Sequence, residues 1–295
     1  MKFPRLLTVC LLFLLVACTG GSGGSDGQTG TASSIENKGS DTIVNLALAW
    51  AEYYQAQHPE VRISVTGGGS GTGLAALING TVDIANASRR IKDEEIQEAR
   101  DNGIDPVEFI IARDAIAVIV HPDNPVEQLT LQQISDIYSG KITNWQEVGG
   151  KDLPIVRLSR ETNSGTHVYF LETVLRLGEK ENTTLFAMET LLLPSSEGII
   201  NEVRQNENAI GYDGLGYVPD DLKIIAVAKE AGSPYVLPLI GTVNDKTYPI
   251  ARDLYMYTAG EPTGAVKEYI AWILSTEAQD IVVELGFVPI LAYNP

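Results

Sequence analysis

The chain has 295 residues, of which 38 are acidic and 21 basic, and its formal net charge is −17. Such a charge disfavours nucleic-acid binding, and it requires that any anionic ligand be captured by local groups rather than by the overall field. Both cysteines, Cys10 and Cys18, lie near the N-terminus, so the rest of the chain has no disulfide and no cysteine metal site. The histidines His58, His121 and His167 have no metal-ligand spacing, and we expect neither a metal nor a cofactor.

Residues 1–17 have the pattern of a bacterial lipoprotein signal peptide. Two basic residues precede an apolar stretch over residues 6–16, which is too short to span a bilayer. The stretch closes on Leu-Val-Ala-Cys, which resembles a lipobox in which Cys18 becomes the lipidated first residue. An ordinary secretory signal with an incidental cysteine is the alternative. The Gly/Ser-rich residues 18–34 then predict a flexible tether, and we expect a protein anchored by its lipid on the extracytoplasmic face, periplasmic or at the cell surface.

Beyond the tether, about 260 residues remain, enough for two lobes. The predicted strands are 62–66, 107–112, 115–121, 155–159, 224–228 and 254–258. The predicted helices are 42–58, 73–79, 92–102, 131–138, 165–177, 197–206 and 264–285. This alternation indicates an α/β chain with mostly parallel sheets, in which ligands bind outside the strand ends.

Polar residues stand at the start of the first predicted helix. Ser40, Asp41 and Thr42 are residue types that cap helices, and capping alone is their better explanation. A glycine-rich run follows at residues 67–73, where each glycine costs roughly 0.5–1 kcal/mol relative to alanine. Such a cost favours close approach of the backbone to a ligand over a simple turn.

The glycine-rich run fits no nucleotide or hydrolase motif well. Its G-x-G-x-x-A match from Gly71 lacks the acidic residue expected about twenty positions later, and Leu74 occupies the P-loop lysine position. The residues around Ser70 fail the nucleophile elbow. Further along, Ser88 and Arg89 follow a strand-like run and could face a cleft, whereas Arg90 is interpreted as part of a solvated turn.

Two short segments repeat the residues Ala-Arg-Asp, at Asp114 and at Asp253. Each places an arginine and an aspartate at the start of a β-prone apolar stretch, which a buried strand tolerates only with a partner or a break. The two segments are either unrelated strands with polar starts or paired crossovers. As crossovers, they would take the chain out of a first lobe near Asp114 and back near Asp253.

Residues 160–166 read Arg-Glu-Thr-Asn-Ser-Gly-Thr, between an apolar run and a predicted helix. The spacing can aim the guanidinium of Arg160, the hydroxyls of Ser164 and Thr166, and free backbone N–H groups at one small oxyanion. An oxyanion receptor is therefore the first hypothesis.

The order of these motifs resembles the phosphate-binding proteins of ABC phosphate importers, the PstS family, over about residues 35–290. In chain order, the motifs that carry the resemblance are Gly39-Ser40-Asp41-Thr42, Gly69-Ser70-Gly71-Thr72-Gly73, Asp83-Ile84-Ala85-Asn86-Ala87-Ser88-Arg89, Tyr138-Ser139-Gly140-Lys141-Ile142-Thr143-Asn144-Trp145, Arg160 with Ser164-Gly165-Thr166, and Ala209-Ile210-Gly211-Tyr212.

The resemblance implies an α/β, two-lobed periplasmic-binding-protein type II fold, each lobe a mostly parallel sheet with flanking helices, joined by two crossover segments. Lobe 1 would comprise 35–113 and 252–295, and lobe 2 would comprise 114–251. It implies a non-enzymatic, monomeric receptor that delivers inorganic phosphate to the permease and ATPase of an ABC importer. The implied phosphate-binding residues are Ser40, Asp41, Thr42, Ser70, Ser88, Arg89, Arg160, Ser164, Gly165 and Thr166.

One position departs from the family pattern. The best-known members carry an aspartate that accepts a proton of phosphate, and the matching position here is Ser88. Sulfate has no such proton at neutral pH, so a buried carboxylate can reject it. The carboxylates that could accept the proton instead are those of Asp114, which is the better placed, and Asp41. The alternative for Asp114 is an ion pair with a neighbouring arginine such as Arg113. Glu197 or a backbone carbonyl is a further candidate acceptor.

Two other functions remain open at this point. The first is a receptor for another tetrahedral oxyanion, such as sulfate, molybdate or tungstate. The second is a secreted phosphate-handling hydrolase, which would need a nucleophile with a base or a metal cluster. The sequence patterns indicate neither a nucleophile with a base nor a metal cluster.

Overall fold

The computed structural model describes residues 33–290. The predicted signal peptide, Cys18 and nearly all of the predicted tether lie outside the described residues. Across the part of the chain that the structure describes, no helix combines the length and apolar character needed to cross a membrane.

A nine-stranded sheet carries the fold, in the order β2-β1-β3-β11-β4-β8-β6-β7 with β9 paired to β4. The strands of this sheet are β1 Ser33–Gly39, β2 Val61–Thr66, β3 Ile84–Ala87, β4 Val107–Val120, β6 Val156–Arg160, β7 Leu191–Leu193, β8 Ala209–Gly214, β9 Lys223–Ile224 and β11 Ala251–Thr258. A separate parallel pair joins β5 Gln128–Thr130 to β10 Ala226–Ala228. Parallel pairs lie toward both ends of the main sheet, and antiparallel pairs lie in its middle.

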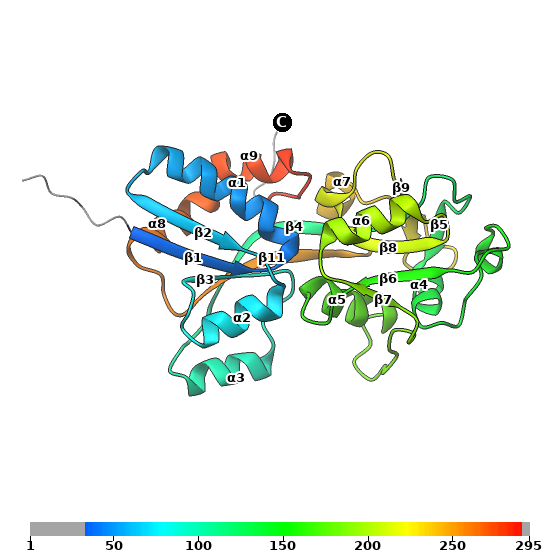
Figure 1. The fold of residues 1–295 in the computed structure, drawn as a ribbon, viewed down its shortest axis with the longest axis horizontal. Coiled ribbons are helices and arrows are strands. Elements are labelled where there is room, and N and C mark those ends of the chain that lie inside the picture. The colour runs from blue at the N-terminus through cyan, green and yellow to red at the C-terminus, as the bar shows by residue number, and fades with distance from the viewer. Residues whose placement is uncertain (1–32, 291–295) are drawn as a thin grey trace, which may run out of the picture. The chain divides into compact units, whose positions relative to one another are not determined.

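The middle of the sheet is formed by β4 and β11, which contain the two Ala-Arg-Asp segments (Figure 1). They run antiparallel, and their register pairs Arg252 with Asp114 and Asp253 with Arg113. The prediction of two strands with a break between 112 and 115 was therefore wrong, because β4 is continuous. The arginine and aspartate of β4 are accommodated because the aspartate and arginine of the partner strand β11 lie opposite them. The two segments are therefore paired with each other.

Two large hydrophobic cores lie toward opposite ends of these middle strands. The first core draws its buried residues from positions before 113 and after 253, and it contains Trp50 and Tyr269. The second draws on residues 115–250, with Val288 added, and it contains Trp145, Phe170 and Tyr212. The changes from one core to the other fall on β4 and β11, where the Ala-Arg-Asp segments lie.

Helices cover both faces of the sheet (Figure 1). The α-helices are α1 Asp41–Gln57, α2 Ser70–Ile78, α3 Asp93–Asp101, α4 Leu131–Tyr138, α5 Gly165–Phe170, α6 Ser196–Gln205, α7 Ile240–Asn244, α8 Gly264–Ile273 and α9 Thr276–Glu284. On the side of the first core, α1, α8 and α9 cover one face, while α2 and α3 cover the other. The helices α1, α2 and α5 begin just after the ends of β1, β2 and β6, respectively. In α/β proteins, ligands bind at such strand ends.

Several predicted boundaries were wrong for local reasons. The helix predicted over 165–177 is α-helical only to Phe170 and continues as a π-helix over Leu171–Leu175. The helix predicted over 264–285 is divided, because the Ser275 side chain caps a new helix by accepting from the N–H of Ala278. The strand predicted over 224–228 is split between β9 and β10.

Candidate anion-binding site

Hydroxyl groups from four separate segments meet where the helices begin. The Oγ1 atoms of Thr42 and Thr166 are 2.8 Å apart, and the Oγ atoms of Ser70 and Ser88 are 3.2 Å apart. Gly165 lies against the serine pair, because a Cβ added there would lie 2.3 Å from Ser70 Oγ and 2.6 Å from Ser88 Oγ. The α1, α2 and α5 starts and the end of β3 thus form one cluster, which we call the hydroxyl cluster.

The hydroxyl cluster is buried, and so are the two serines that precede its helices. Ser40 and Ser164 are 2% and 4% exposed. Ser164 caps α5 by accepting from the N–H of Thr166 at 3.2 Å. Within the described residues, the side chain of Ser40 makes no capping hydrogen bond to α1. Capping, the better explanation of Ser40 from sequence alone, is therefore not its role here.

The guanidinium of Arg160 lies beside this cluster and is 1% exposed. Its Nη2 donates to Asp41 Oδ2 and to the carbonyl oxygen of Pro194, both at 2.8 Å. Its Nη1 donates to Ser196 Oγ at 3.0 Å and lies 3.8 Å from Asp213 Oδ2. Among the residues that the structure describes, its buried Nε has no hydrogen-bond partner. Arg160 therefore retains one donor for a ligand.

The second guanidinium of the site belongs to Arg252, which sequence reasoning did not select. Its Nη2 donates to Asp114 Oδ2 and Thr166 Oγ1, both at 2.9 Å, and lies 3.4 Å from Thr42 Oγ1. Its Nη1 donates to the carbonyl oxygen of Ser88 at 2.8 Å. The repeated Ala-Arg-Asp segment was the signal that could have found it, had the antiparallel pairing been known.

Two buried carboxylates face the two guanidiniums. Asp114 forms an ion pair with an arginine, as its alternative reading expected, but the partner is Arg252 and not Arg113. Burial raises the pKa of Asp114, although the charge of Arg252 opposes the shift. Asp213, which no motif pointed to, accepts from Ser196 Oγ at 2.9 Å, and burial raises its pKa to about 6. Asp114 Oδ1 and Asp213 Oδ2 are both buried without a hydrogen-bond partner in residues 33–290.

In residues 33–290, two predicted candidates make no hydrogen bond to the hydroxyl groups of the cluster. Arg89 was expected in the site, but its Nη1 and Nη2 bind the two carboxylate oxygens of Glu95 at 2.8 and 2.6 Å. Glu197, a further candidate acceptor, is exposed on α6. Arg90 pairs with Glu108 at 2.8 Å and is exposed, as its interpretation as a solvated residue predicted.

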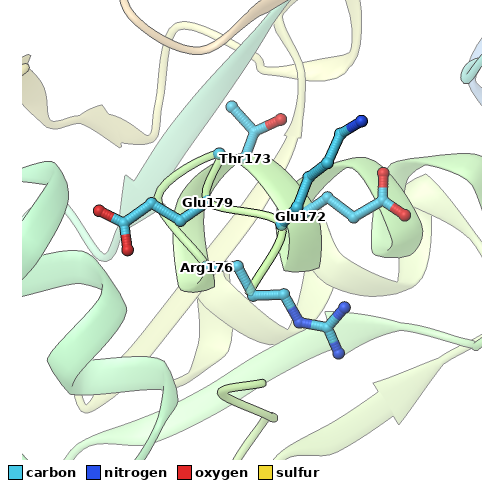
Figure 2. Close-up of a pocket in the computed structure, with 6 residues that line it drawn as sticks. Glu172, Thr173, Arg176 and Glu179 are labelled. Atoms are coloured by element: carbon cyan, nitrogen blue, oxygen red, sulfur yellow. The ribbon is translucent and has the colours of Figure 1, made fainter. Parts of the chain in front are cut away.

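A pocket of about 410 Å³ lies elsewhere, around the π-helix. Figure 2 shows Glu172, Thr173, Arg176 and Glu179 in its wall, and the side chains of Arg176 and Glu179 point in different directions. Its charges do not converge on a common point, and none of its lining residues belongs to the hydroxyl cluster. In the described part of the chain, no group of three or more His, Cys, Asp or Glu residues is arranged to hold a metal ion.

Comparisons with known proteins agree with this geometry. A family model described as the PBP superfamily domain matches residues 24–277. The phosphate-binding protein PstS of Pseudomonas aeruginosa is 32% identical over 281 residues, which cover 90% of this chain and 85% of that protein. PstS of Bacillus subtilis is 30% identical over 305 residues, covering 98% and 95%.

Solved structures point the same way. A protein from Clostridium perfringens, described as a phosphate ABC transporter substrate-binding protein and solved with bound phosphate, is 36% identical with a TM-score of 0.78, covering 88% of this chain and all of that one. An ABC-type phosphate transport receptor from Vibrio cholerae is 31% identical with a TM-score of 0.70, covering 86% and 99%. The mixed α/β fold is that of the periplasmic-binding-protein type II class, as predicted. The chain belongs to the PBP superfamily and, within it, to the family of PstS phosphate-binding proteins.

Proposed function

We propose that this chain captures inorganic phosphate in a cleft between two lobes and delivers it to the permease and ATPase of an ABC phosphate importer. Relatives at about 30% identity over most of the chain are named phosphate-binding proteins, and one similar structure holds phosphate. The observation that carries the proposal is the buried hydroxyl cluster, to which Arg252 donates and whose Thr42 follows Asp41, the partner of Arg160. Charge-assisted donors of this kind are suited to a desolvated oxyanion.

The two lobes would be residues 35–113 with 252–295, and residues 114–251. The two hydrophobic cores support this division, because their membership changes on β4 and β11. The hydroxyl cluster joins groups from both sides, since Thr42 and Ser70 come from the first and Thr166 from the second. A ligand held there would be enclosed when the lobes close.

The proposed phosphate ligands are the motif residues that the structure brings together, with Arg252 added and Arg89 omitted. They are Ser40, Asp41, Thr42, Ser70, Ser88, Arg160, Ser164, Gly165, Thr166 and Arg252. In this arrangement Asp41 contributes its backbone N–H, because its carboxylate is engaged by Arg160 and by the N–H of Gly68. The free Nε of Arg160 is the donor that a bound anion would satisfy.

The charges of the site favour an anion that brings its own proton. Three carboxylates, those of Asp41, Asp114 and Asp213, stand against the two guanidiniums. An anion without a proton offers these carboxylates no donor, so their oxygens would face its oxygens in a buried place, at high cost. Asp114 Oδ1 has no partner in residues 33–290, so it can accept the proton of a phosphate P–O–H group, which sulfate lacks. We therefore retain Asp114 as the proposed proton acceptor.

We propose that the receptor is not a hydrolase. One serine and one histidine do meet, because Ser159 Oγ lies 3.0 Å from His167 Nδ1. Ser159 is fully buried, however, and its Oγ is also 2.6 Å from the hydroxyl oxygen of Tyr212. A nucleophile enclosed by its neighbours cannot reach a phosphate ester. Release of the chromophore from a chromogenic phosphate ester would contradict this interpretation.

Titration calorimetry with phosphate, sulfate, arsenate and molybdate tests the proposed function. Phosphate and arsenate carry an ionisable proton near neutral pH, so both should bind, whereas sulfate and molybdate should bind far more weakly. Preferential binding of sulfate or molybdate would replace phosphate with another tetrahedral oxyanion as the ligand.

We further propose that Cys18 is lipidated and that the receptor is a monomer held at the membrane by this lipid. Cys18→Ala should release a soluble protein that still binds phosphate, because the tether precedes the folded body. Membrane association that persists in the variant would count against the lipobox. Sedimentation of the released protein measures its oligomeric state.

A further inference from the structure

Asn163 joins the β6–α5 segment to the glycine-rich loop before α2. Its carbonyl oxygen accepts from the N–H of Gly71 at 3.0 Å, and its side-chain Nδ2 donates to the carbonyl oxygen of Gly68 at 2.9 Å. Asn163 is itself exposed, whereas the next three residues are buried in the site. The contact therefore lies at the rim of the hydroxyl cluster and links groups on the two sides of it.

Two glycines of this loop, and Gly71 in the first turn of α2, lie against protein neighbours. A Cβ added to Gly69 would lie 2.9 Å from the carbonyl oxygen of Asn163, and one added to Gly71 would lie 3.3 Å from the same atom. At Gly67 a Cβ would lie 2.4 Å from Asp41 Oδ1. The sequence favoured close approach of this loop to a ligand, but the close approach seen here is to Asn163 and Asp41.

The loop is also coupled to Arg160. Asp41 accepts from the N–H of Gly68 at 2.9 Å through Oδ1 and from Arg160 Nη2 at 2.8 Å through Oδ2. Gly68 is therefore held on one side by Asp41 and on the other by Asn163. The contacts with Asn163 exist only when the two sides are together, because Asn163 comes from the opposite side of the site.

We propose that Asn163 is a positioning residue that holds the closed arrangement and thereby sets the lifetime of bound phosphate without contacting it. The inference rests on the proposed function. A ligand enclosed between two lobes leaves only after the lobes open, and the Asn163 hydrogen bonds must break in that step. Because they form after the anion has entered, they slow its dissociation and have little effect on its association.

The first test compares Asn163→Ala with Asn79→Ala. Asn79 is exposed and also donates from Nδ2 to a backbone carbonyl oxygen, that of Ala75 at 2.8 Å, but both residues belong to α2 and its C-cap. Stopped-flow kinetics should show phosphate leaving Asn163→Ala about two- to tenfold faster, the range that one hydrogen bond spans, with an unchanged association rate. Asn79→Ala should dissociate like the wild type. Equal dissociation rates in the two variants would overturn the proposal.

The second test adds a methyl group at the contact. Gly71→Ala places a Cβ against Asn163, whereas Gly241→Ala, also in a helix, meets nothing within 4 Å in the described structure. Alanine favours helix over glycine, so neither change should lower the thermal midpoint of the ligand-free protein. Gly71→Ala should nevertheless bind phosphate several-fold more weakly, again through faster dissociation. A fall in thermal midpoint that accounts for the weaker binding would indicate a merely structural role.

The two proposals can fail separately. If the wild type binds sulfate or molybdate in place of phosphate, the proposed function is wrong, and the Asn163 comparison is made with that anion because the contact does not depend on its identity. If phosphate binds but Asn163→Ala keeps the wild-type dissociation rate, only the role of Asn163 is rejected. Absence of binding to all four anions would reject both.

Discussion

The two Ala-Arg-Asp segments form two ion pairs of the same composition in opposite surroundings. Arg113 and Asp253 are 3.3 Å apart, and their side chains are 41% and 34% exposed. Arg252 and Asp114 are 2.9 Å apart, with exposures of 3% and 1%. Neighbouring residues on a strand point to opposite faces of a sheet, so one antiparallel register places one pair at the surface and the other inside.

Burial, and not the residue pattern, distinguishes the Arg252–Asp114 pair at the candidate site from the Arg113–Asp253 pair. An exposed ion pair contributes little, because water screens it. A buried pair must offset the loss of hydration of both charges and is often no better than an apolar pair. Arg252, however, also donates to Thr166 and to the carbonyl oxygen of Ser88. The buried pair therefore orders the hydroxyl cluster, which an apolar pair could not do.

Removing Arg252 should have the largest effect on the free energy of unfolding. Arg252→Ala leaves the buried carboxylate of Asp114 without its counter-ion, so the free energy of unfolding should fall by about 3–5 kcal/mol. Urea denaturation measures this loss. Arg252→Lys keeps the charge, should fold, and should still bind phosphate poorly because it loses the forked donors. If Arg252→Ala were no more destabilising than Arg113→Ala, the contrast between the pairs would be wrong.

Removal of the other buried guanidinium, that of Arg160, should mainly lower phosphate affinity. Arg160→Ala should weaken phosphate binding at least tenfold, because each charge-assisted hydrogen bond to a buried anion contributes about 1.5–3 kcal/mol. Calorimetry measures the affinity. Arg204→Ala is the matched control, since Arg204 donates to Asp221 at 2.7 Å but lies at the surface. Wild-type affinity in a folded Arg160→Ala protein would exclude this residue from the site.

The buried carboxylate of Asp213 should make stability depend on pH. Its pKa is raised to about 6 in the folded state, so the folded protein holds a proton that the unfolded chain has released. The free energy of unfolding should therefore decrease as pH rises from about 4 to about 6, by up to about 1.4 kcal/mol per pH unit. Asp213→Asn should remove this part of the slope in urea denaturation. Asp221→Asn, at an exposed carboxylate whose pKa is lowered, should not remove it.

Replacement of Asp114 should have a smaller effect, which should appear in the preference for phosphate over sulfate. Asp114→Asn should lower phosphate affinity several-fold and narrow the gap to sulfate, because an amide can donate where the carboxylate only accepts. Calorimetry with both anions measures the gap, and Asp41→Asn is the parallel test. If both variants keep the wild-type preference, neither carboxylate accepts the proton, and the free Oδ2 of Asp213 becomes the candidate.

The exposed pair should show the smallest effect. Arg113→Ala should change the free energy of unfolding by no more than about 1 kcal/mol, and less in high salt, because the pair is screened by water and ions. Phosphate affinity should remain that of the wild type. A loss comparable with that of Arg252→Ala would show that the surface pair also orders the site.

Local patterns sufficed for much of the fold. Alternating apolar runs predicted an α/β chain, whereas the predicted meeting of the Arg160 guanidinium with the hydroxyls of Ser164 and Thr166 around an anion stays a prediction, because Arg160 donates to Asp41, Pro194 and Ser196. Some strong motifs proved structural: Trp145, from the Ser-Gly-Lys-Ile-Thr-Asn-Trp run, is buried in the second core and donates to the carbonyl oxygen of Asn208. Strand β1 was missed because its residues are mostly polar, although Ile35 is fully buried.

By itself, the sequence determined the class of fold and the family, because both depend on residues near one another in the chain. Only the tertiary structure decided that Arg252 contacts the hydroxyl cluster, that Asp213 lies near Arg160, that Arg89 binds Glu95, and that Asn163 lies against Gly69 and Gly71. These outcomes depend on strand register and on the face to which each side chain points. A shift of one residue in the pairing of β4 with β11 would set Arg252 opposite Arg113, or Asp253 opposite Asp114, and so break both ion pairs, and no local pattern specifies that register.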